Sequence, residues 1–134
     1  MSSSKTAVIV STDTNYLHHI ETGRFALSTD EPAALGGQGA APAPFQYYLA
    51  ALSACTAITL RMYAQRKGWN LGQFRAELAL SFDDAGKPQV HRVLHSDQDL
   101  SDEQWTRLLE IVANTPVTKA LRDGAVITSE RAQR

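Results

Sequence analysis

The sequence predicts an α+β protein in which antiparallel strands lie before and after one long central helix. Three observations support this prediction: apolar and β-branched residues alternate before residue 30, a helical pattern of about six turns begins at Pro44, and apolar alternation returns between residues 74 and 95. Strands grouped on both sides of a helix, without a repeating βαβ order, are typical of α+β folds. The 134 residues fit a single domain, 1–134, with one hydrophobic core.

The first thirty residues are expected to form three strands. Lys5–Thr12 is rich in β-branched residues and predicts the first strand. Tyr16–Ile20 and Arg24–Thr29 predict a hairpin that turns at Glu21–Gly23, where the glycine supplies a positive φ. The segment "DEPAALGGQGAAPAP", residues 30–44, predicts a loop because of its glycine and proline content.

The central helix is expected to run from Pro44 to about Lys67, with Gly68 as its stop. Charge appears only from Arg61 onward, and a helix that is apolar nearly all round is a buried one. A chain this short cannot bury such a helix alone, so we expect a second subunit to cover it. The apolar positions are Tyr47, Leu49, Ala51, Leu52, Ala54, Cys55, Ile58 and Met62.

The segment after this helix predicts a second hairpin. Phe74–Phe82, "FRAELALSF", alternates as a strand with one solvated face, and Gln89–His95 returns as its partner.

Two shorter helices and a last strand are expected to follow. Ser101 and Gln104 form a capping-box pattern for a helix from Asp102 to about Ala113. Thr115 is expected to be the N-cap of a helix that starts at Pro116 and ends at Gly124. Residues 125–128 predict a final short strand.

Composition excludes several functional classes. A net charge of −1 gives no footprint for nucleic acid or for an anionic membrane. The start "MSSSKTAVIV" has no signal-peptide pattern, and the most apolar segment, residues 47–60, is too short to span a bilayer. We therefore expect a cytoplasmic protein without a membrane or nucleic-acid partner, whose single cysteine, Cys55, is a free thiol.

The histidines do not predict a metal site. His18 and His19 are neighbours on a strand and point to opposite faces, so they cannot bind one metal together. His91 and His95 share a face but lack a third ligand. We expect no metal and no cofactor.

The loop is equally unpromising as a binding site. The "GGQG" segment at residues 36–39 follows no buried parallel strand and lacks the Lys-Ser/Thr ending of a phosphate loop, so it is interpreted as a chain reversal. Asp30 and Glu31 could form a carboxylate pair, but a solvated loop entry before Pro32 is the simpler interpretation.

Cys55 has two interpretations from its sequence context. Free cysteine is among the residue types most often buried, so it can be an inert filler of the core. As a reactive thiol it would need a lowered pKa or an activating neighbour, and its position in mid-helix supplies neither.

Two segments resemble the OsmC/Ohr family of osmotically inducible and organic-hydroperoxide-resistance proteins. The first, residues 30–71, contains a Gly-Gly turn, a Pro-x-Pro entry and the pattern Leu-Ala-Ala-Leu-x-x-Cys-Thr; the second, "LLEIVANTPVTKAL", matches a region that usually reads Cys-Pro-Val-x-x-x-Leu. The resemblance extends from about residue 6 to 129. It implies an intertwined homodimer in which antiparallel sheets surround two long, shared central helices.

The resemblance also implies an activity. Members of this family are thiol peroxidases: a helix cysteine attacks the peroxide as a thiolate and becomes a sulfenic acid, which a second cysteine resolves to a disulfide that a dithiol reduces. An arginine and a glutamate near the first cysteine lower its pKa and orient the peroxide.

These roles carry over to this chain only in part. Cys55 matches the attacking cysteine, whereas Thr115 stands at the position of the resolving cysteine and cannot form a disulfide. Gln46 stands where the glutamate is usual, and Arg24 is the nearest candidate for the arginine that stabilises the thiolate.

Three hypotheses follow. The first is a one-cysteine hydroperoxide reductase with peroxiredoxin activity, an antioxidant in the oxidative stress response, which uses an external thiol or dithiol as reductant. The second is a non-catalytic homodimer that binds a small apolar molecule at its interface. The third is a structural dimer with an inert Cys55. The aromatic residues expected to line the binding site are Phe45, Tyr47, Tyr48 and Trp105.

Overall fold

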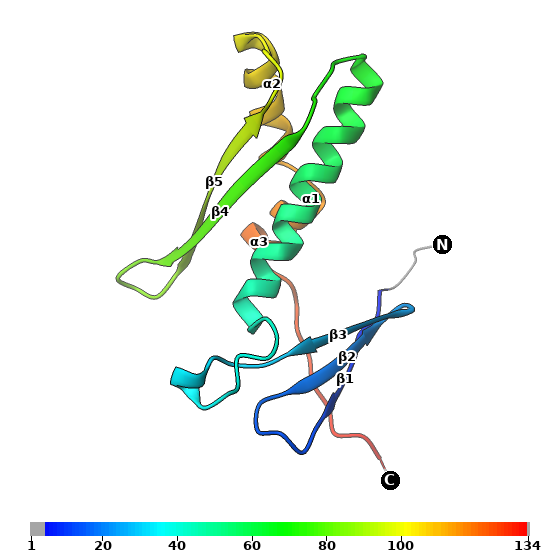
Figure 1. Ribbon diagram of the computed structural model, residues 1–134, viewed down its shortest axis with the longest axis vertical. Coiled ribbons are helices and arrows are strands. Elements are labelled where there is room, and N and C mark those ends of the chain that lie inside the picture. Colours follow the sequence, from blue (N-terminus) through cyan, green and yellow to red (C-terminus); the bar gives the residue numbers. More distant parts are fainter. Residues whose placement is uncertain (1–4, 134) are drawn as a thin grey trace. The chain divides into compact units, whose positions relative to one another are not determined.

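The computed structural model describes residues 5–133 and confirms the α+β class (Figure 1). Within these residues, three α-helices accompany two antiparallel sheets. The chain divides into two compact units, residues 1–48 and 49–134, and each is described by itself. The prediction of a single domain stays a prediction.

The first unit contains a three-stranded antiparallel sheet. Its strands β1 (Val8–Ser11), β2 (His18–Thr22) and β3 (Phe25–Thr29) lie in the order β1-β2-β3. Both outer strands pair with β2, and Ile9 and Leu27 flank Ile20 in the register. Strand β1 is shorter than predicted because its ladder with β2 covers only four residues.

The position predicted for the hairpin turn was wrong. Glu21 and Thr22 belong to β2 and pair with Ala26 and Phe25, so the turn falls at residues 23–24 instead. Gly23 has a φ of 61°, which a two-residue hairpin turn of matching twist requires at its first position.

The loop after β3 is organised around a buried carboxylate. It contains one short 3-10 helix, η1 (Ala33–Leu35). Asp30, predicted to be solvated, is 2% exposed, and its side chain accepts hydrogen bonds from the backbone N–H groups of Glu31 (2.8 Å), Gln38 (3.1 Å) and Ala40 (3.1 Å). These bonds lower the pKa of Asp30, that from Ala40 most strongly, against the opposing effect of burial. The glycine-rich segment is therefore a chain reversal closed on a carboxylate.

Helix α1 (Pro44–Lys67) begins and ends where the sequence predicted, and Gly68 follows it with a φ of 72°. In the second unit, β4 (Phe74–Phe82) and β5 (Pro88–Ser96) form an antiparallel hairpin.

Helices α2 (Asp102–Val112) and α3 (Pro116–Asp123) complete the second unit. The complete capping box predicted for α2 is present: Ser101 accepts from the backbone N–H of Gln104, and the Gln104 side chain accepts from the backbone N–H of Ser101.

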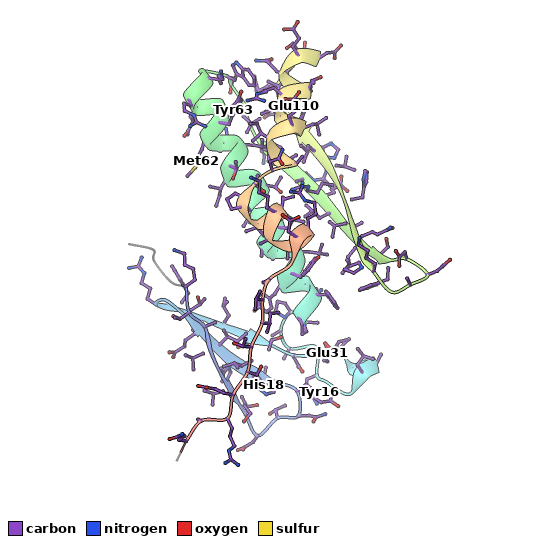
Figure 2. The ribbon with its side chains drawn as sticks, turned by 180° about the vertical axis from the view of Figure 1, so that it is seen from behind. Tyr16, His18, Glu31, Met62, Tyr63 and Glu110 are labelled. Atoms are coloured by element: carbon purple, nitrogen blue, oxygen red, sulfur yellow. The ribbon has the colours of Figure 1, made fainter. Side chains whose placement is uncertain are left out.

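One face of α1 packs into the core of the second unit. This core consists of Leu60, Tyr63, Ala64, Leu71, Leu108 and Val112. On another face of the same helix Ile58 and Met62 are 56% and 62% exposed. Figure 2 shows Met62 pointing away from α2. The chain by itself therefore buries only part of the helix that the sequence predicts to be buried all round.

The final strand predicted at residues 125–128 was wrong for the single chain. The segment has no regular structure, and Val126 and Ile127 are 96% and 85% exposed. A strand requires a partner for its backbone hydrogen bonds, and within residues 5–133 no other segment pairs with this one. In the described part of the chain, no helix is both long enough and apolar enough to cross a membrane.

Candidate active site

Cys55 lies near the middle of α1 and is partly exposed. The backbone N–H of Val117 and the side-chain hydroxyl of Thr115 face its sulfur and lower its pKa. The Thr59 hydroxyl lies 3.9 Å from the sulfur, one turn further along α1. Thr115 is the N-cap residue of α3 and Val117 its second helical residue, so the sulfur lies at a helix N-terminus, where backbone N–H groups have no partner within the helix.

This environment lowers the pKa of Cys55. Burial has the largest single effect and raises the pKa, but the hydrogen bonds of Val117, Thr115 and Thr59 and the positive charge of Arg92 together outweigh it. Because the thiolate is the nucleophilic form of cysteine, this shift favours reactivity. Apart from Thr59, which lies on α1, the activating groups come from β5 and the start of α3, so most of them could not be found among the neighbours of Cys55 along α1.

Arg92 is the cation of this site. It extends from β5 and is half-buried. Its Nη1 donates to the hydroxyl oxygens of Thr56 (2.8 Å) and Thr118 (3.1 Å), and its Nη2 donates to the carbonyl of Val112 (2.8 Å). Burial lowers the pKa of Arg92 and the nearby Cys55 raises it, but a guanidinium remains charged in proteins.

Sequence reasoning missed Arg92, although a signal for it exists. In β5 the inward face carries Val90, Arg92 and Leu94, so the arginine occupies an apolar position of an alternating strand. A charge in that pattern requires a buried partner.

Thr115 occupies the N-cap position, as predicted, but its hydroxyl serves the site rather than the helix. It is 2% exposed and lies 2.7 Å from the hydroxyl of Thr118. The Thr118 hydroxyl is also within 3.2 Å of the Val112 carbonyl. Two threonines thus connect the guanidinium of Arg92 to the sulfur of Cys55.

The structure brings together Cys55 and Thr115 among the predicted site residues. The contacts of Gln46 and Arg24 lie in the first unit. The Gln46 side chain accepts a hydrogen bond from the backbone N–H of Ala43 (2.8 Å), the position of a capping glutamine at the start of α1. Arg24 lies in the β2–β3 turn, with its guanidinium carbon 5.6 Å from the ring centre of Phe25.

The predicted aromatic residues also make local contacts. The rings of Phe45 and Tyr48 meet edge to face at 5.6 Å, and the Tyr47 hydroxyl donates to the carbonyl of Ser28, all within the first unit. Trp105 packs against the core of the second unit.

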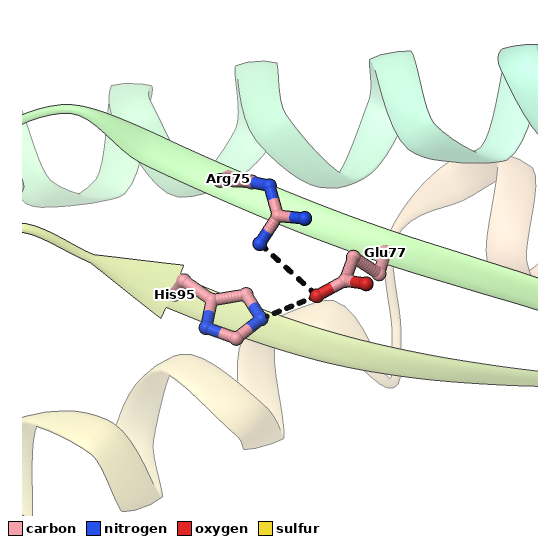
Figure 3. Close-up of polar contacts among 3 residues, drawn as sticks. All are labelled: Arg75, Glu77 and His95. Carbon is pink, nitrogen blue, oxygen red and sulfur yellow. Dashed lines mark hydrogen bonds and ion pairs between the residues drawn. The ribbon is translucent and has the colours of Figure 1, made fainter.

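Three of the histidines, His18, His19 and His95, take part in local hydrogen bonds. On the exposed face of the second hairpin, Glu77 accepts from His95 Nε2 (2.8 Å) and from Arg75 Nη1 (3.0 Å), as Figure 3 shows. Among residues 5–133, no three His, Cys, Asp or Glu side chains are grouped so that they could hold a metal ion.

A groove of about 550 Å³ opens beside the thiol's hydroxyl partners. Thr59 and Thr115, both in contact with the Cys55 sulfur, line it. Tyr63 and Glu110 lie on its α1 and α2 sides (Figure 2). The remaining lining residues are Arg66, Arg107, Ile111, Ala113, Asn114 and Pro116.

The fold and the site define an α+β protein with one free thiol held at a helix N-terminus. Residues 37–130 match the family model described as OsmC-like protein, and the chain therefore belongs to the OsmC-like family. No curated protein matches the chain.

Solved structures with the same fold include three from bacteria. An OsmC-like protein from Mycoplasma pneumoniae has 17% identity and a TM-score of 0.72, over 91% of this chain and 89% of that one. An organic hydroperoxide resistance protein OsmC from Legionella pneumophila has 23% identity and a TM-score of 0.66, over 90% of each chain. The organic hydroperoxide resistance protein OhrB of Bacillus subtilis has 20% identity and a TM-score of 0.62, over 89% of this chain and 90% of that one.

Proposed function

We propose that this protein is a one-cysteine hydroperoxide reductase of the cytoplasm, active in the oxidative stress response, with Cys55 as the attacking thiol. The observation that carries the proposal is the environment of the sulfur: the hydrogen bonds of Val117 and Thr115 and the charge of Arg92 lower the pKa of Cys55. Membership of the OsmC-like family, and the names of the two hydroperoxide-resistance proteins that share its fold, support the same chemistry.

The first step forms a sulfur–oxygen bond. The Cys55 thiolate attacks the terminal, OH-bearing oxygen of the hydroperoxide, the O–O bond breaks, and the leaving alkoxide takes a proton from solvent to become an alcohol. The sulfur is oxidised by two electrons to a sulfenic acid, and the peroxide is reduced by the same two electrons.

The second step requires a thiol from outside the chain. Cys55 is the only cysteine, and the hydroxyl of Thr115 at the usual resolving position cannot form a disulfide. An external thiol attacks the sulfenic sulfur and releases water. A second thiol, which can belong to the same dithiol molecule, then breaks the mixed disulfide and restores Cys55.

A homodimer is part of the proposal. The exposed apolar side chains of α1, Ile58 and Met62, are the surface that a second copy would cover. Within this assembly Arg24 and Gln46 are assigned to orienting the peroxide, and Phe45, Tyr47 and Tyr48 to contacting its apolar group. Light scattering coupled to size-exclusion chromatography measures the oligomeric state.

The test of the activity uses purified protein with cumene hydroperoxide and dithiothreitol. We expect peroxide consumption that Cys55→Ser abolishes, and a sulfenic acid on Cys55 detectable by a dimedone adduct when the thiol is withheld. Peroxide that stays unchanged for hours while Cys55 remains reduced would refute the proposal.

A second candidate is a non-catalytic homodimer that binds a small apolar ligand. It is favoured by the lack of a second cysteine and by the 51% exposure of the Phe45 residue. Ligand screening by thermal shift separates the two candidates, because a binder should keep its ligand in the Cys55→Ser variant.

A further inference from the structure

The number of hydrogen bonds that each hydroxyl group between Arg92 and Cys55 can donate is fixed by its contact with Arg92. A guanidinium only donates hydrogen bonds, so the oxygens of Thr56 and Thr118 must both act as acceptors toward Arg92. Each hydroxyl then has a single proton to give elsewhere. Thr56 is fully buried and donates its proton to the carbonyl of Leu52 (2.8 Å), which fixes it as an anchor for the guanidinium.

Thr118 differs because two acceptors lie within its reach. Its oxygen is 3.2 Å from the carbonyl oxygen of Val112 and 2.7 Å from the hydroxyl oxygen of Thr115. Its one proton can go to either of them. The Thr115 hydroxyl in turn lies between Thr118 and the sulfur of Cys55.

These contacts allow two complete arrangements. When Cys55 is a neutral thiol, the S–H donates to Thr115, Thr115 donates to Thr118, and Thr118 donates to the Val112 carbonyl. When Cys55 is a thiolate, Thr118 donates to Thr115 and Thr115 donates to the sulfur. The Val112 carbonyl keeps the hydrogen bond from Arg92 Nη2 in both states.

We propose that Thr115, Thr118 and Arg92 form a hydrogen-bond relay that reverses its direction when Cys55 ionises, which makes Thr118 and Arg92 positioning residues for the thiolate. Neither arrangement leaves a buried polar atom without a partner, and an unpaired buried group is the usual cost of such a rearrangement. This inference deepens the proposed function and rests on it for its biological meaning, but the relay concerns only the ionisation of the thiol.

Arg92 has two effects in this relay. Its charge favours the thiolate directly. The hydrogen bond from its Nη2 keeps the Val112 carbonyl paired, so Thr118 can donate its proton to Thr115 instead. Among residues 5–133, Arg92 is the charged side chain that acts on Cys55; the groups facing the sulfur from α1 and α3 are Thr59, Thr115 and the backbone of Val117.

The test measures the rate of Cys55 alkylation by iodoacetamide from pH 5 to 10, with no peroxide present. Thr118→Val removes one hydroxyl that does not touch the sulfur. We expect its alkylation rate at pH 7 to fall about three- to tenfold, the effect of losing one hydrogen bond that supports a charge. At high pH, where both proteins are fully ionised, the two rates should converge. Thr118→Ser, which keeps the hydroxyl, should restore the profile of the parent.

Two further variants make the result specific. Thr106→Val makes the same chemical change at an exposed position of α2 and should leave the profile unchanged. Arg92→Gln should shift it further than Thr118→Val, because it removes the charge as well as the donor. If Thr118→Val does not fold, as judged by circular dichroism, Thr118→Ala takes its place.

The relay is refuted if the valine or alanine variant keeps the alkylation profile of the parent, or if Thr118→Ser behaves like valine. A shifted profile in a protein that consumes no peroxide would support the relay and refute the proposed function. An unshifted alkylation profile in a protein that consumes peroxide would refute the relay and support the proposed function.

Discussion

Replacing Thr115 by cysteine should convert the one-cysteine site into one that closes a disulfide. The Thr115 hydroxyl contacts the Cys55 sulfur, so a sulfur atom at the same position starts within reach of the sulfenic acid formed there. We expect one equivalent of peroxide to oxidise Thr115→Cys to an intrachain disulfide, with release of water, and the reductant to be needed only afterwards.

The stabilisation that this disulfide gives follows from the length of the loop that it closes. The two positions are about 60 residues apart in the sequence, and closing a loop of that length stabilises the folded state by about 4 kcal/mol in the chain-entropy description, less any strain. The free energy of unfolding should therefore be higher for the oxidised variant than for the same protein in dithiothreitol.

Urea denaturation in both redox states measures this difference, and intact mass reports the loss of two hydrogens. Thr118→Cys is the matched control, because Thr118 bonds Thr115 rather than the sulfur and its cysteine should stay a thiol. Two free thiols in Thr115→Cys after peroxide has been consumed would contradict the placement of Thr115 against Cys55.

Three further predictions concern the fold. The lowered pKa of Asp30 means that its contribution to stability is present above the ordinary pKa of an aspartate and is lost as the pH falls through the lowered value; hydrogen exchange should show the protection of the Gln38 and Ala40 amides decreasing in that acidic window, and Asp30→Asn should remove the pH dependence. Leu108→Ala deletes a fully buried core side chain and should lower the free energy of unfolding in urea by about 2–5 kcal/mol, whereas a loss below 1 kcal/mol would place Leu108 outside the core. Met62→Glu puts a charge on the exposed apolar face of α1 and should weaken the proposed dimer about a thousandfold in sedimentation, because each of the two subunits loses roughly 2 kcal/mol of apolar burial. Monomer stability should not fall, and an unchanged dimer would move the interface elsewhere.

Features set by neighbouring residues could be predicted from the sequence. The bounds of α1 follow from Pro44 and Gly68, and the start of α2 follows from the Ser101–Gln104 capping box. Each of these signals acts within one turn of helix, so no knowledge of the rest of the fold is needed.

Features that depend on distant parts of the chain were missed. Arg92 and Thr118 reach the surroundings of Cys55 from β5 and α3, and no local pattern connects such separate segments. The strand predicted at residues 125–128 failed for a related reason: β-branched composition gives a segment the capacity to pair, but the described chain offers it no partner. In the first hairpin, the composition located the turn and the register of β2 with β3 decided its exact residues.

The position of the Cys55 sulfur at the start of α3 has a consequence for the end of the chain. The first turn of α3 faces an acceptor from α1, the Cys55 sulfur. The polarity of this group changes with each oxidation step. Each added oxygen changes the acceptor that faces the Val117 amide and the Thr115 hydroxyl, so we expect the protection of α3 from hydrogen exchange to change with the oxidation state of Cys55. The rate of limited proteolysis after residue 116 would then depend on the oxidation state of Cys55.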